Sequence, residues 1–398
     1  MRVLFVVWGW PSHFFAMVPT AWACWSAGHE VLVATQPVLQ PTLRETGLPA
    51  ASVGTDLNTA AMFRERMAPA KDDEGRLSRL SAPDAPRPAE PAADPRMLIL
   101  EVYGALARAM TDDTVRVARR WGADVVVWDP ITFAGAIAAR ACGAVSVRHT
   151  WGLDSARFMG LYDAWPPDLH ELLAEYDVPF ERIREDLCLD ICPPRLQIPP
   201  AGRTVTARSV PYNGADVGVI RMLPPPRLPR VCVTWGTTVE QLAGQGQFPA
   251  GAVLCDLAAR DVEVVVAASD AQIAELGTLP KNVVASGWLP LRSVLESCTA
   301  IVHEGGAGTV LTASRLGVPQ LVIPALHEQI LAGEQLAAAG AGQHLPAGEV
   351  TEESLAECLS ALLRDDEHRA AAEDLRQHIL AQPSLAEIVS RWGDDLAS

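Results

Sequence analysis

The segment from residue 299 to residue 319 holds residues that could bind a phosphate group. Its sequence, TAIVHEGGAGTVLTASRLGVP, predicts a short buried strand, a glycine-rich turn and a helix that ends at Gly317. Glycines let the backbone of a turn approach a ligand closely. A helix N-terminus offers unpaired N–H groups and the positive end of the helix dipole, which suit an anion. His303 ends the strand, where a ring nitrogen could donate to that phosphate. An ordinary strand-to-helix turn with a capping histidine is the alternative.

Other residues capable of chemistry also stand at the ends of predicted strands. His13 follows the first strand and opens a helix, and Asp129 ends a strand in the sequence VVWDP. Gly236, Trp288 and Glu328 take similar positions further along the chain. Because open α/β sheets bind their ligands beyond the carboxyl ends of the strands, these positions predict one ligand-binding cleft.

His13 and Asp129 together could remove a proton from a hydroxyl group. An imidazole with an ordinary pKa near 6.5 suits general base catalysis. A carboxylate can hold such a ring in the required tautomer and stabilise its protonated form. Each residue has a plainer alternative, since both precede or open a predicted helix and could simply cap it.

The elements that must position these residues alternate between strand and helix, which predicts parallel sheets. The first half contains predicted strands at 1–8, 30–35, 123–130 and 145–151. The second half contains predicted strands at 231–236, 262–269, 282–290, 300–302 and 320–324. The fold class that follows is α/β, with two Rossmann-like parallel-sheet domains that face each other across a cleft. No G-x-G-x-x-G sequence follows a predicted strand, which argues against a nicotinamide or flavin cofactor.

Proline-rich segments set the expected domain boundaries. Residues 1–220 form the predicted N-terminal domain, and residues 231–380 form the second domain. The linker is 221–230, RMLPPPRLPR, because three consecutive prolines fit neither a helix nor a central strand. A mobile loop is expected at about 60–97, either as a lid or as a plain linker. Residues 381–398 are expected to form a helix that packs back toward the N-terminal domain.

Composition restricts the class of protein. The 398 residues are 49% hydrophobic and 20% charged, as in globular proteins of two or three domains. The formal net charge is -16, and the 32 Lys and Arg residues form no basic stripe, so nucleic acid is not an expected partner. No apolar run reaches about 18 residues, so no membrane span is predicted. The N-terminal MRVLFVVWGWP is interpreted as a strand and not as a signal peptide.

The eight cysteines predict neither a disulfide framework nor a zinc site. Cys188 and Cys192 are four positions apart, with no histidine or second cysteine pair to complete a metal site. We interpret the cysteines as small buried hydrophobic residues in a reducing compartment, and expect a cytoplasmic protein.

Seven segments, in this order, resemble the GT-B glycosyltransferases of family 1. The likeness spans nearly the whole chain and is strongest to the actinobacterial natural-product branch, which includes the macrolide and spinosyn deoxysugar transferases. The segments that carry it are SHFFAMVPTAWACWSAGHEV (12–31), VVWDPITFAGAIAAR (126–140), VPYNG (210–214), RVCVTWGTT (230–238), GWLP (287–290), HEGGAGT (303–309) and GVPQLVIP (317–324).

The resemblance implies an inverting transfer of a deoxysugar from a dTDP-sugar to a polyketide-like aglycone in antibiotic biosynthesis. It implies that His13 is the general base and that Asp129 orients it. No Asp-x-Asp pair of the kind that holds a divalent metal is present, so a metal-independent reaction without a cofactor is expected. The helix dipole and the turn would stabilise the leaving diphosphate instead.

The resemblance also assigns donor-binding residues. The residues implied for the diphosphate are Thr237, Thr238, His303, Gly305, Gly306, Gly308 and Thr309. Trp288 would stack on the base while the backbone of Leu289 reads its edge, and Glu328 and Gln329 would contact sugar hydroxyls. The threonines could instead form a plain turn, and Trp288 could be a core residue. Two positions depart from the family pattern. Members of the family usually have Asp where this chain has Glu328, and many have a second His where it has Glu304. We therefore assign Glu304 no phosphate contact.

The predicted acceptor surface is aromatic, as an apolar aglycone requires. Its candidate residues, any of which could also be core, are Trp8, Trp10, Phe14, Trp151 and Phe158. The sequence leaves open a C-glycosyltransferase acting on an aromatic polyketide, a sugar-nucleotide epimerase of the same fold and a non-catalytic sugar-nucleotide binding protein. It also leaves open an auxiliary protein partner and a homodimer.

Overall fold

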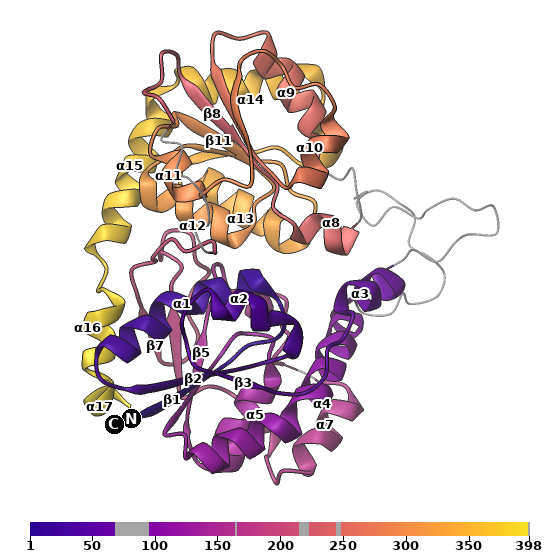
Figure 1. The fold of residues 1–398 in the computed structure, drawn as a ribbon, viewed down its shortest axis with the longest axis vertical. Coiled ribbons are helices and arrows are strands. Elements are labelled where there is room, and N and C mark those ends of the chain that lie inside the picture. The colour runs from indigo at the N-terminus through magenta and orange to yellow at the C-terminus, as the bar shows by residue number, and fades with distance from the viewer. Residues whose placement is uncertain (68–94, 164, 215–222, 244–247, 397–398) are drawn as a thin grey trace, which may run out of the picture.

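A computed structural model of the protein describes residues 1–67, 95–163, 165–214, 223–243 and 248–396 (Figure 1). Within these ranges two parallel sheets form two α/β domains, one above the other in Figure 1. Most of the predicted mobile loop, at 68–94, and the start of the predicted linker lie outside the described residues.

The N-terminal domain is built on a seven-stranded parallel sheet with the order β3-β2-β1-β4-β5-β6-β7. The strands are β1 (Arg2–Val6), β2 (Glu30–Thr35), β3 (Ala50–Ser52), β4 (Val125–Trp128), β5 (Val145–His149), β6 (Leu187–Asp190) and β7 (Thr204–Thr206). Strands β1 and β4 are runs of Val, Leu, Phe and Trp that are buried on both faces, which is the pattern of a covered parallel sheet. Their registry pairs Val3 with Val125 and Val6 with Trp128, so the two strands end at the same edge.

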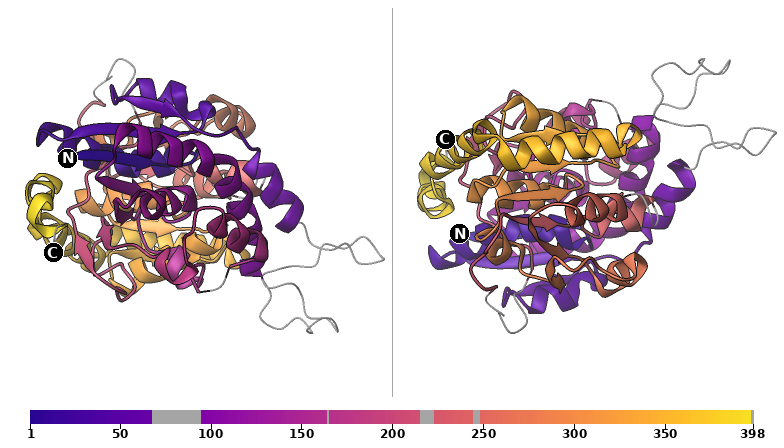
Figure 2. Two further views of the ribbon diagram at one scale, coloured as in Figure 1. Left: turned by 90° about the horizontal axis from the view of Figure 1, so that it is seen from below. Right: turned by 90° about the horizontal axis from the view of Figure 1, so that it is seen from above.

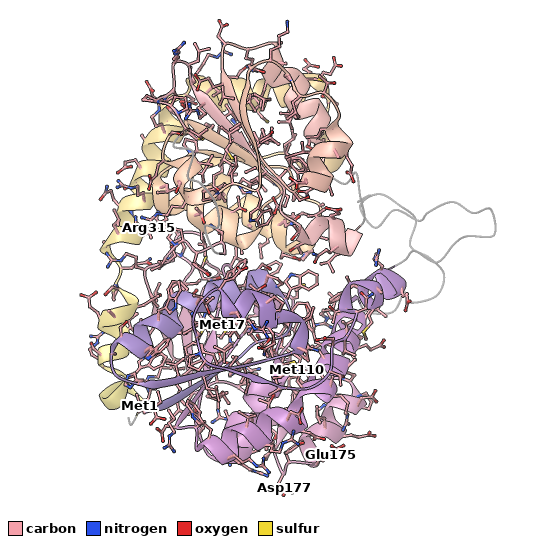
Figure 3. All side chains as sticks on the ribbon, in the orientation of Figure 1. Met1, Met17, Met110, Glu175, Asp177 and Arg315 are labelled. Atoms are coloured by element: carbon pink, nitrogen blue, oxygen red, sulfur yellow. The ribbon has the colours of Figure 1, made fainter. Side chains whose placement is uncertain are left out.

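Helices cover both faces of this sheet. They are α1 (Pro11–Ser26), α2 (Gln40–Arg44), α3 (Thr59–Met67), α4 (Pro95–Trp121), α5 (Phe133–Cys142), α6 (Ser155–Phe158) and α7 (Pro167–Ala174), with short 3₁₀ turns at Pro37–Leu39 and Phe180–Arg182. Met17 from α1 and Met110 from α4, both labelled in Figure 3, are almost completely buried in the core that these helices form with the sheet.

The C-terminal domain is built on a six-stranded parallel sheet with the order β10-β9-β8-β11-β12-β13. The strands are β8 (Arg230–Val233), β9 (Glu263–Ala267), β10 (Val283–Gly287), β11 (Ala300–His303), β12 (Gln320–Val322) and β13 (Gly342–His344). The helices are α8 (Thr238–Ala243), α9 (Ala250–Ala258), α10 (Asp270–Leu276), α11 (Leu291–Leu295), α12 (Ala307–Leu316), α13 (His327–Ala338) and α14 (Glu352–Arg364), with a 3₁₀ turn at Ala347–Glu349.

The end of the chain returns from the second domain to the first. Helix α15 (Asp366–Ala381) runs down one side of the molecule, and α16 (Leu385–Ser390) and α17 (Trp392–Asp395) follow it (Figure 1). Helix α16 packs on α1, and Trp392 is fully buried in the N-terminal core. The Arg208 N–H also donates to the Pro383 carbonyl over 2.8 Å. Both views of Figure 2 accordingly place the two termini on the same side of the molecule.

The interface between the domains is packed and apolar in part. Val310 and Leu311 from α12 belong to the same buried cluster as the N-terminal core. The backbones approach closely at Gly152, where a Cβ atom would lie 2.7 Å from the Cβ of Ala307. A side chain at position 152 would therefore force the two domains apart.

The sequence missed one long element. Helix α4 spans 27 residues, and its first residues, from Pro95, were expected in the mobile loop. Residues 59–67, also assigned to that loop, form helix α3. The proline- and alanine-rich composition that suggested a loop belongs to the segment between these two helices.

Candidate active site between the domains

The candidate site lies where the strand order reverses in both sheets. In the N-terminal sheet that point is between β1 and β4, and in the C-terminal sheet it is between β8 and β11. Ligands of open α/β sheets bind at such switch points, beyond the carboxyl ends of the strands. His13 and Asp129 follow the first pair of strands, and Gly236 and Gly305 follow the second pair.

His13 sits in the first turn of α1, which begins at Pro11. Its Nδ1 lies 3.6 Å from Oδ1 of Asp129, and the His13 side chain is 15% exposed. Nδ1 is buried and has no hydrogen-bond partner at this distance. Catalytic hydrogen bonds are often long in unliganded enzymes and shorten when substrate binds. The ring is fixed from two sides, by Trp151 with centroids 4.1 Å apart and by the edge of Trp8 at 5.2 Å.

Asp129 is held rigidly at the end of β4. Its Oδ1 accepts from the Ile131 N–H over 3.0 Å, and its Oδ2 accepts from the Thr132 hydroxyl over 2.6 Å. The Thr132 oxygen in turn accepts from the Trp8 N–H over 3.2 Å, which ties the ends of β1 and β4 together. These bonds fix the turn that leads into α5 and leave Oδ1 directed at the imidazole. Sequence reasoning missed Thr132, although its position three residues after the aspartate is typical of a side-chain turn.

Glu328 lies near His13, and Tyr103 lies near Glu328 and Asp129. Glu328, from the start of α13, keeps solvent access, but crowding by protein atoms raises its pKa while the nearby charge of His13 lowers it. Burial, followed by the charges of Glu328 and Asp129, raises the pKa of Tyr103 on α4. Tyr103 was not among the predicted residues because no element was predicted between the mobile loop and the strand at 123–130.

The turn between β11 and α12 requires glycine. Gly305 has φ +97°, and a Cβ atom there would lie 2.9 Å from Cγ1 of Val322 and 3.1 Å from the carbonyl oxygen of Gln329. Gly306 is the N-cap of α12 and supplies no side chain to satisfy the first N–H groups of the helix. An anion is the natural partner of such a helix start. Thr309 is half-buried one turn into the interface, and Gly308 lies next to Asn213 from the N-terminal domain.

His303 stabilises this turn by a hydrogen bond to its backbone. The ring is fully buried, Nδ1 accepts from the Gly305 N–H over 3.0 Å, and Nε2 donates to Oε1 of Gln320 over 2.9 Å. Burial lowers the pKa of His303 to about 4, so the ring is neutral at physiological pH. Both nitrogens are thus engaged within the protein, and a direct contact between His303 and a phosphate stays a prediction.

The neighbouring turn after β8 lies beside the first one. Gly236 has φ +53°, and its carbonyl accepts from Nε2 of Gln272 over 2.7 Å. Thr237 and Thr238 follow it, half-buried, and Thr238 begins α8. Their predicted contact with a diphosphate remains untested by the geometry, which shows only that both hydroxyls stand at the correct strand end.

The other predicted donor residues differ in exposure. Trp288 is 68% exposed beyond the end of β10, so it is not a core residue, and Leu289 is half-buried. Gln329 is buried, and its Oε1 accepts from the N–H groups of Ala325 and Leu326, which shapes the start of α13. Glu328 beside it has the accessible side chain of the pair.

The predicted acceptor residues fall into two groups. Trp8 and Trp10 stack in parallel at 4.9 Å and are buried, and Phe14 is buried at 1% exposure. Trp151 is half-buried against His13, while Phe158 is 51% exposed and stacks on His327 across the interface. Trp151 and Phe158 are therefore the two that offer accessible aromatic surface for an acceptor.

A cavity lies between the two domains beside these residues. Trp151 and Ser155 line it from the N-terminal domain, and Gly305, Ala307 and Glu328 line it from the C-terminal domain. In the described part of the chain no three His, Cys, Asp or Glu residues gather into a possible metal site. No helix among the described residues is long and apolar enough to cross a membrane.

Comparison with known proteins identifies the family. The N-terminal domain model of the erythromycin biosynthesis protein CIII-like proteins matches residues 22–236, and the C-terminal domain model matches residues 251–394. The chain is 35% identical to the 10-deoxymethynolide desosaminyltransferase of Streptomyces venezuelae, over 98% of this chain and 96% of that protein. It is also 35% identical to the tylactone mycaminosyltransferase of Streptomyces fradiae, over 98% and 91% of the two chains.

Solved structures agree with this placement. The glycosyltransferase VinC, in complex with dTDP, superposes with a TM-score of 0.79 at 32% identity, over the full length of both chains. The spinosyn forosaminyltransferase SpnP superposes with a TM-score of 0.80 at 31% identity, again over both full chains. The spinosyn rhamnosyltransferase SpnG, solved with the spinosyn aglycone, gives a TM-score of 0.80 at 29% identity over 99% of this chain and all of that chain. The chain therefore has the GT-B fold and belongs to the erythromycin biosynthesis protein CIII-like family of glycosyltransferases.

Proposed function

We propose that the protein is an inverting, metal-independent glycosyltransferase that moves a deoxysugar from a dTDP-sugar to a hydroxyl group of a polyketide-like aglycone. The observation that supports the proposal is a cavity between the domains, lined by a residue that contacts His13 and by the glycine-rich turn. Trp151, whose ring contacts His13, and Gly305, which forms the turn, both line that cavity.

His13 acts as the general base in this proposal. Its Nδ1 faces Asp129, which leaves Nε2 to accept the proton of the acceptor hydroxyl. The acceptor oxygen forms a bond to the anomeric carbon from the face opposite the nucleotide, and the bond from that carbon to the diphosphate oxygen breaks. The configuration of the sugar inverts, the proton stays on His13, and dTDP leaves as the anion. The ionised Asp129 stabilises the imidazolium that forms.

The C-terminal domain supplies the stabilisation of the leaving group. Free N–H groups at the start of α12 and the positive end of its dipole would face the diphosphate. The residues proposed for the diphosphate are Thr237, Thr238, His303, Gly305, Gly306, Gly308 and Thr309. Trp288, exposed at 68%, would stack on thymine, with Leu289 reading its edge and with Glu328 and Gln329 toward the sugar.

The dTDP donor and the polyketide acceptor rest on the relatives. VinC and SpnG have been solved with dTDP or thymidine diphosphate, and SpnG also with the spinosyn aglycone. Two of the relatives are named as a desosaminyltransferase of 10-deoxymethynolide and a mycaminosyltransferase of tylactone. Trp8, Trp10, Phe14, Trp151 and Phe158 are proposed for the acceptor side. Eight free cysteines fit a reducing cytoplasm.

Product analysis separates this proposal from its alternatives. The purified chain is incubated with a dTDP-deoxysugar, a panel of macrolide and aromatic polyketide aglycones, and EDTA. An O-glycoside with inverted anomeric configuration supports the proposal. An acid-stable C-glycoside would show that the sugar is transferred to a carbon atom and not to a hydroxyl oxygen. Conversion of the donor without an acceptor indicates an epimerase, and tight donor binding without any product indicates a binding protein. Activity that appears only with an added partner, or only in a dimeric fraction, would reveal an auxiliary protein or a homodimer.

A further inference from the structure

Glu304 lies between the two turns that form the proposed diphosphate site. Glu304 follows His303, the last residue of β11, and it is only 3% exposed. A Cβ atom at Gly236 would be 2.8 Å from Oε1 of Glu304, and a Cβ atom at Gly306 would be 2.6 Å from the same oxygen. Only glycine at these two positions leaves room for the carboxyl group. The carboxyl group is therefore wedged between the β8–α8 turn and the start of α12.

One oxygen of this buried carboxyl group has no partner. Oε2 is buried and makes no hydrogen bond, and no cation in the described part of the chain forms an ion pair with Glu304. Burial raises the pKa of Glu304 to about 7, against the opposing effect of the Glu304 and Gly306 N–H groups. A buried carboxyl group with a free oxygen can satisfy that oxygen as an O–H donor once it is protonated.

The titratable groups on the neighbouring elements do not neutralise Glu304. His303 on β11 is buried and neutral, because burial lowers its pKa to about 4. Helix α8 contributes Glu240, and the start of α13 contributes His327 and Glu328. An ionised Glu304 and a diphosphate would thus place like charges side by side in a site with little water, which is strongly unfavourable.

We infer that Glu304 is a donor-binding residue that works in its protonated form, with its carboxyl O–H donating to a diphosphate oxygen of the sugar nucleotide. Binding of the donor then takes up one proton from solvent whenever Glu304 is ionised in the free protein. This inference rests on the proposed function, because it needs a diphosphate at the α12 turn. It deepens that function by giving the donor site a proton requirement.

The direction of the pH dependence follows from linkage. Below about pH 7 the free protein already carries the proton on Glu304, so donor affinity is independent of pH. Above that pH Glu304 must take up a proton from solvent each time a donor molecule binds, so the Kd for the donor rises about tenfold for each pH unit. If Glu304 instead moved out of the turn into water when the donor binds, it would ionise and release a proton below pH 7. The Kd for the donor would then not rise above pH 7.

The test is calorimetric titration with dTDP-glucose, a sugar nucleotide whose diphosphate carries no group that titrates between pH 5.5 and 8.5. Titrations at pH 6.0, 7.0, 8.0 and 8.5, each in two buffers of different ionisation enthalpy, give the number of protons taken up. The inference predicts uptake that approaches one proton at pH 8.5 and none at pH 6.0. Binding with no proton uptake, or with proton release, overturns it while the proposed function stands. Failure of dTDP-glucose and UDP-glucose to bind at every pH overturns the proposed function itself.

Variants assign the proton to its residue. Glu304→Gln keeps the shape of the side chain, and its amide N–H can donate a hydrogen bond at any pH. The Kd of this variant should therefore be independent of pH, and its proton uptake should vanish. Glu328→Gln, the matched change in the other cleft carboxyl group with a raised pKa, should keep the uptake. Uptake that survives in Glu304→Gln and disappears in Glu328→Gln would overturn the assignment. Thermal unfolding at pH 6.0 and 8.5 checks that each variant folds. If Glu304→Gln does not fold, the proton uptake measured with the wild-type protein tests the inference by itself.

Discussion

Nδ1 of His13 lies 3.6 Å from Oδ1 of Asp129, with the ring clasped by Trp8 and Trp151 and the carboxylate held by two donors. The carboxylate is fixed more firmly than the imidazole, since it is 1% exposed and already has two hydrogen bonds. In the proposed reaction this arrangement would preorganise the pair for removal of the acceptor proton, while no hydrogen bond joins the two side chains in the free protein.

Replacement of the proposed base tests this relationship first. His13→Ala should lower kcat for glycoside formation by about 10²- to 10⁴-fold, which is the usual contribution of a general base. The affinity for dTDP, which we assign to the other domain, should change less than about threefold. Steady-state kinetics and calorimetric titration check the two expectations. Full activity in the folded His13→Ala protein would contradict the assignment.

Thr132 should matter because its hydroxyl donates to Asp129 and also accepts from the Trp8 N–H beside His13. Thr132→Val removes the hydroxyl that donates to Oδ2, and a hydrogen bond to a charged group contributes about 1.5–3 kcal/mol. We expect kcat to fall by about tenfold or more, with a changed pH profile of kcat and an unaltered Kd for dTDP. Thr132→Ser keeps the hydroxyl and should restore most of the rate. A Thr132→Val enzyme with wild-type kcat and pH profile would remove Thr132 from the account.

Trp288 offers a test of donor recognition that leaves the fold intact. Because its side chain is 68% exposed, Trp288→Ala should change thermal stability little. Loss of base stacking should weaken dTDP binding by about 1–3 kcal/mol, or roughly 5- to 150-fold in Kd. Trp25→Ala, at an exposed tryptophan of α1 in the other domain, serves as the matched control and should leave Kd unchanged. Equal effects of the two substitutions would contradict base stacking at Trp288.

Gly305 tests the geometry of the turn. Gly305→Ala would place a Cβ atom against Val322 and the Gln329 carbonyl at φ +97°, at a cost of about 1–3 kcal/mol in the free energy of unfolding. It should also weaken dTDP binding, because the turn must open to admit the methyl group. Gly348→Ala is the control, since a Cβ atom there has no neighbour within 4 Å. Chemical denaturation of both variants measures the difference, and a harmless Gly305→Ala would mean that the turn is not constrained.

The sequence predicted the parts of this molecule whose pattern is local. Strand β2 occurs at the predicted residues, and α12 ends at Gly317 as predicted, because β-branched runs and capping glycines act within a few residues. His13 and Asp129 lie together for a related reason, since the parallel strands that precede them end at a common edge of the sheet.

What the sequence could not supply depends on distant contacts. Helix α4 is an exception, because Leu106, Met110, Thr114 and Ala118 are buried and recur at helical spacing, so its pattern is local and was overlooked. The inward position of Tyr103 went unseen with it. The hydrogen bonds that engage both nitrogens of His303 come from Gly305 and from Gln320 on the next strand, a pairing that residue spacing does not reveal. The confinement of Glu304 between two glycines likewise depends on turns that are 68 residues apart, at positions 236 and 304.

The most direct test of the central claim is the product of a single reaction mixture that contains the purified chain, a dTDP-deoxysugar, a macrolide aglycone and EDTA. Mass spectrometry detects the glycoside, and NMR coupling at the anomeric carbon gives its configuration. The account predicts an O-glycoside of inverted configuration that forms at the same rate with and without EDTA and is nearly abolished in His13→Ala. Retained configuration, or a rate that EDTA abolishes and magnesium restores, would contradict it.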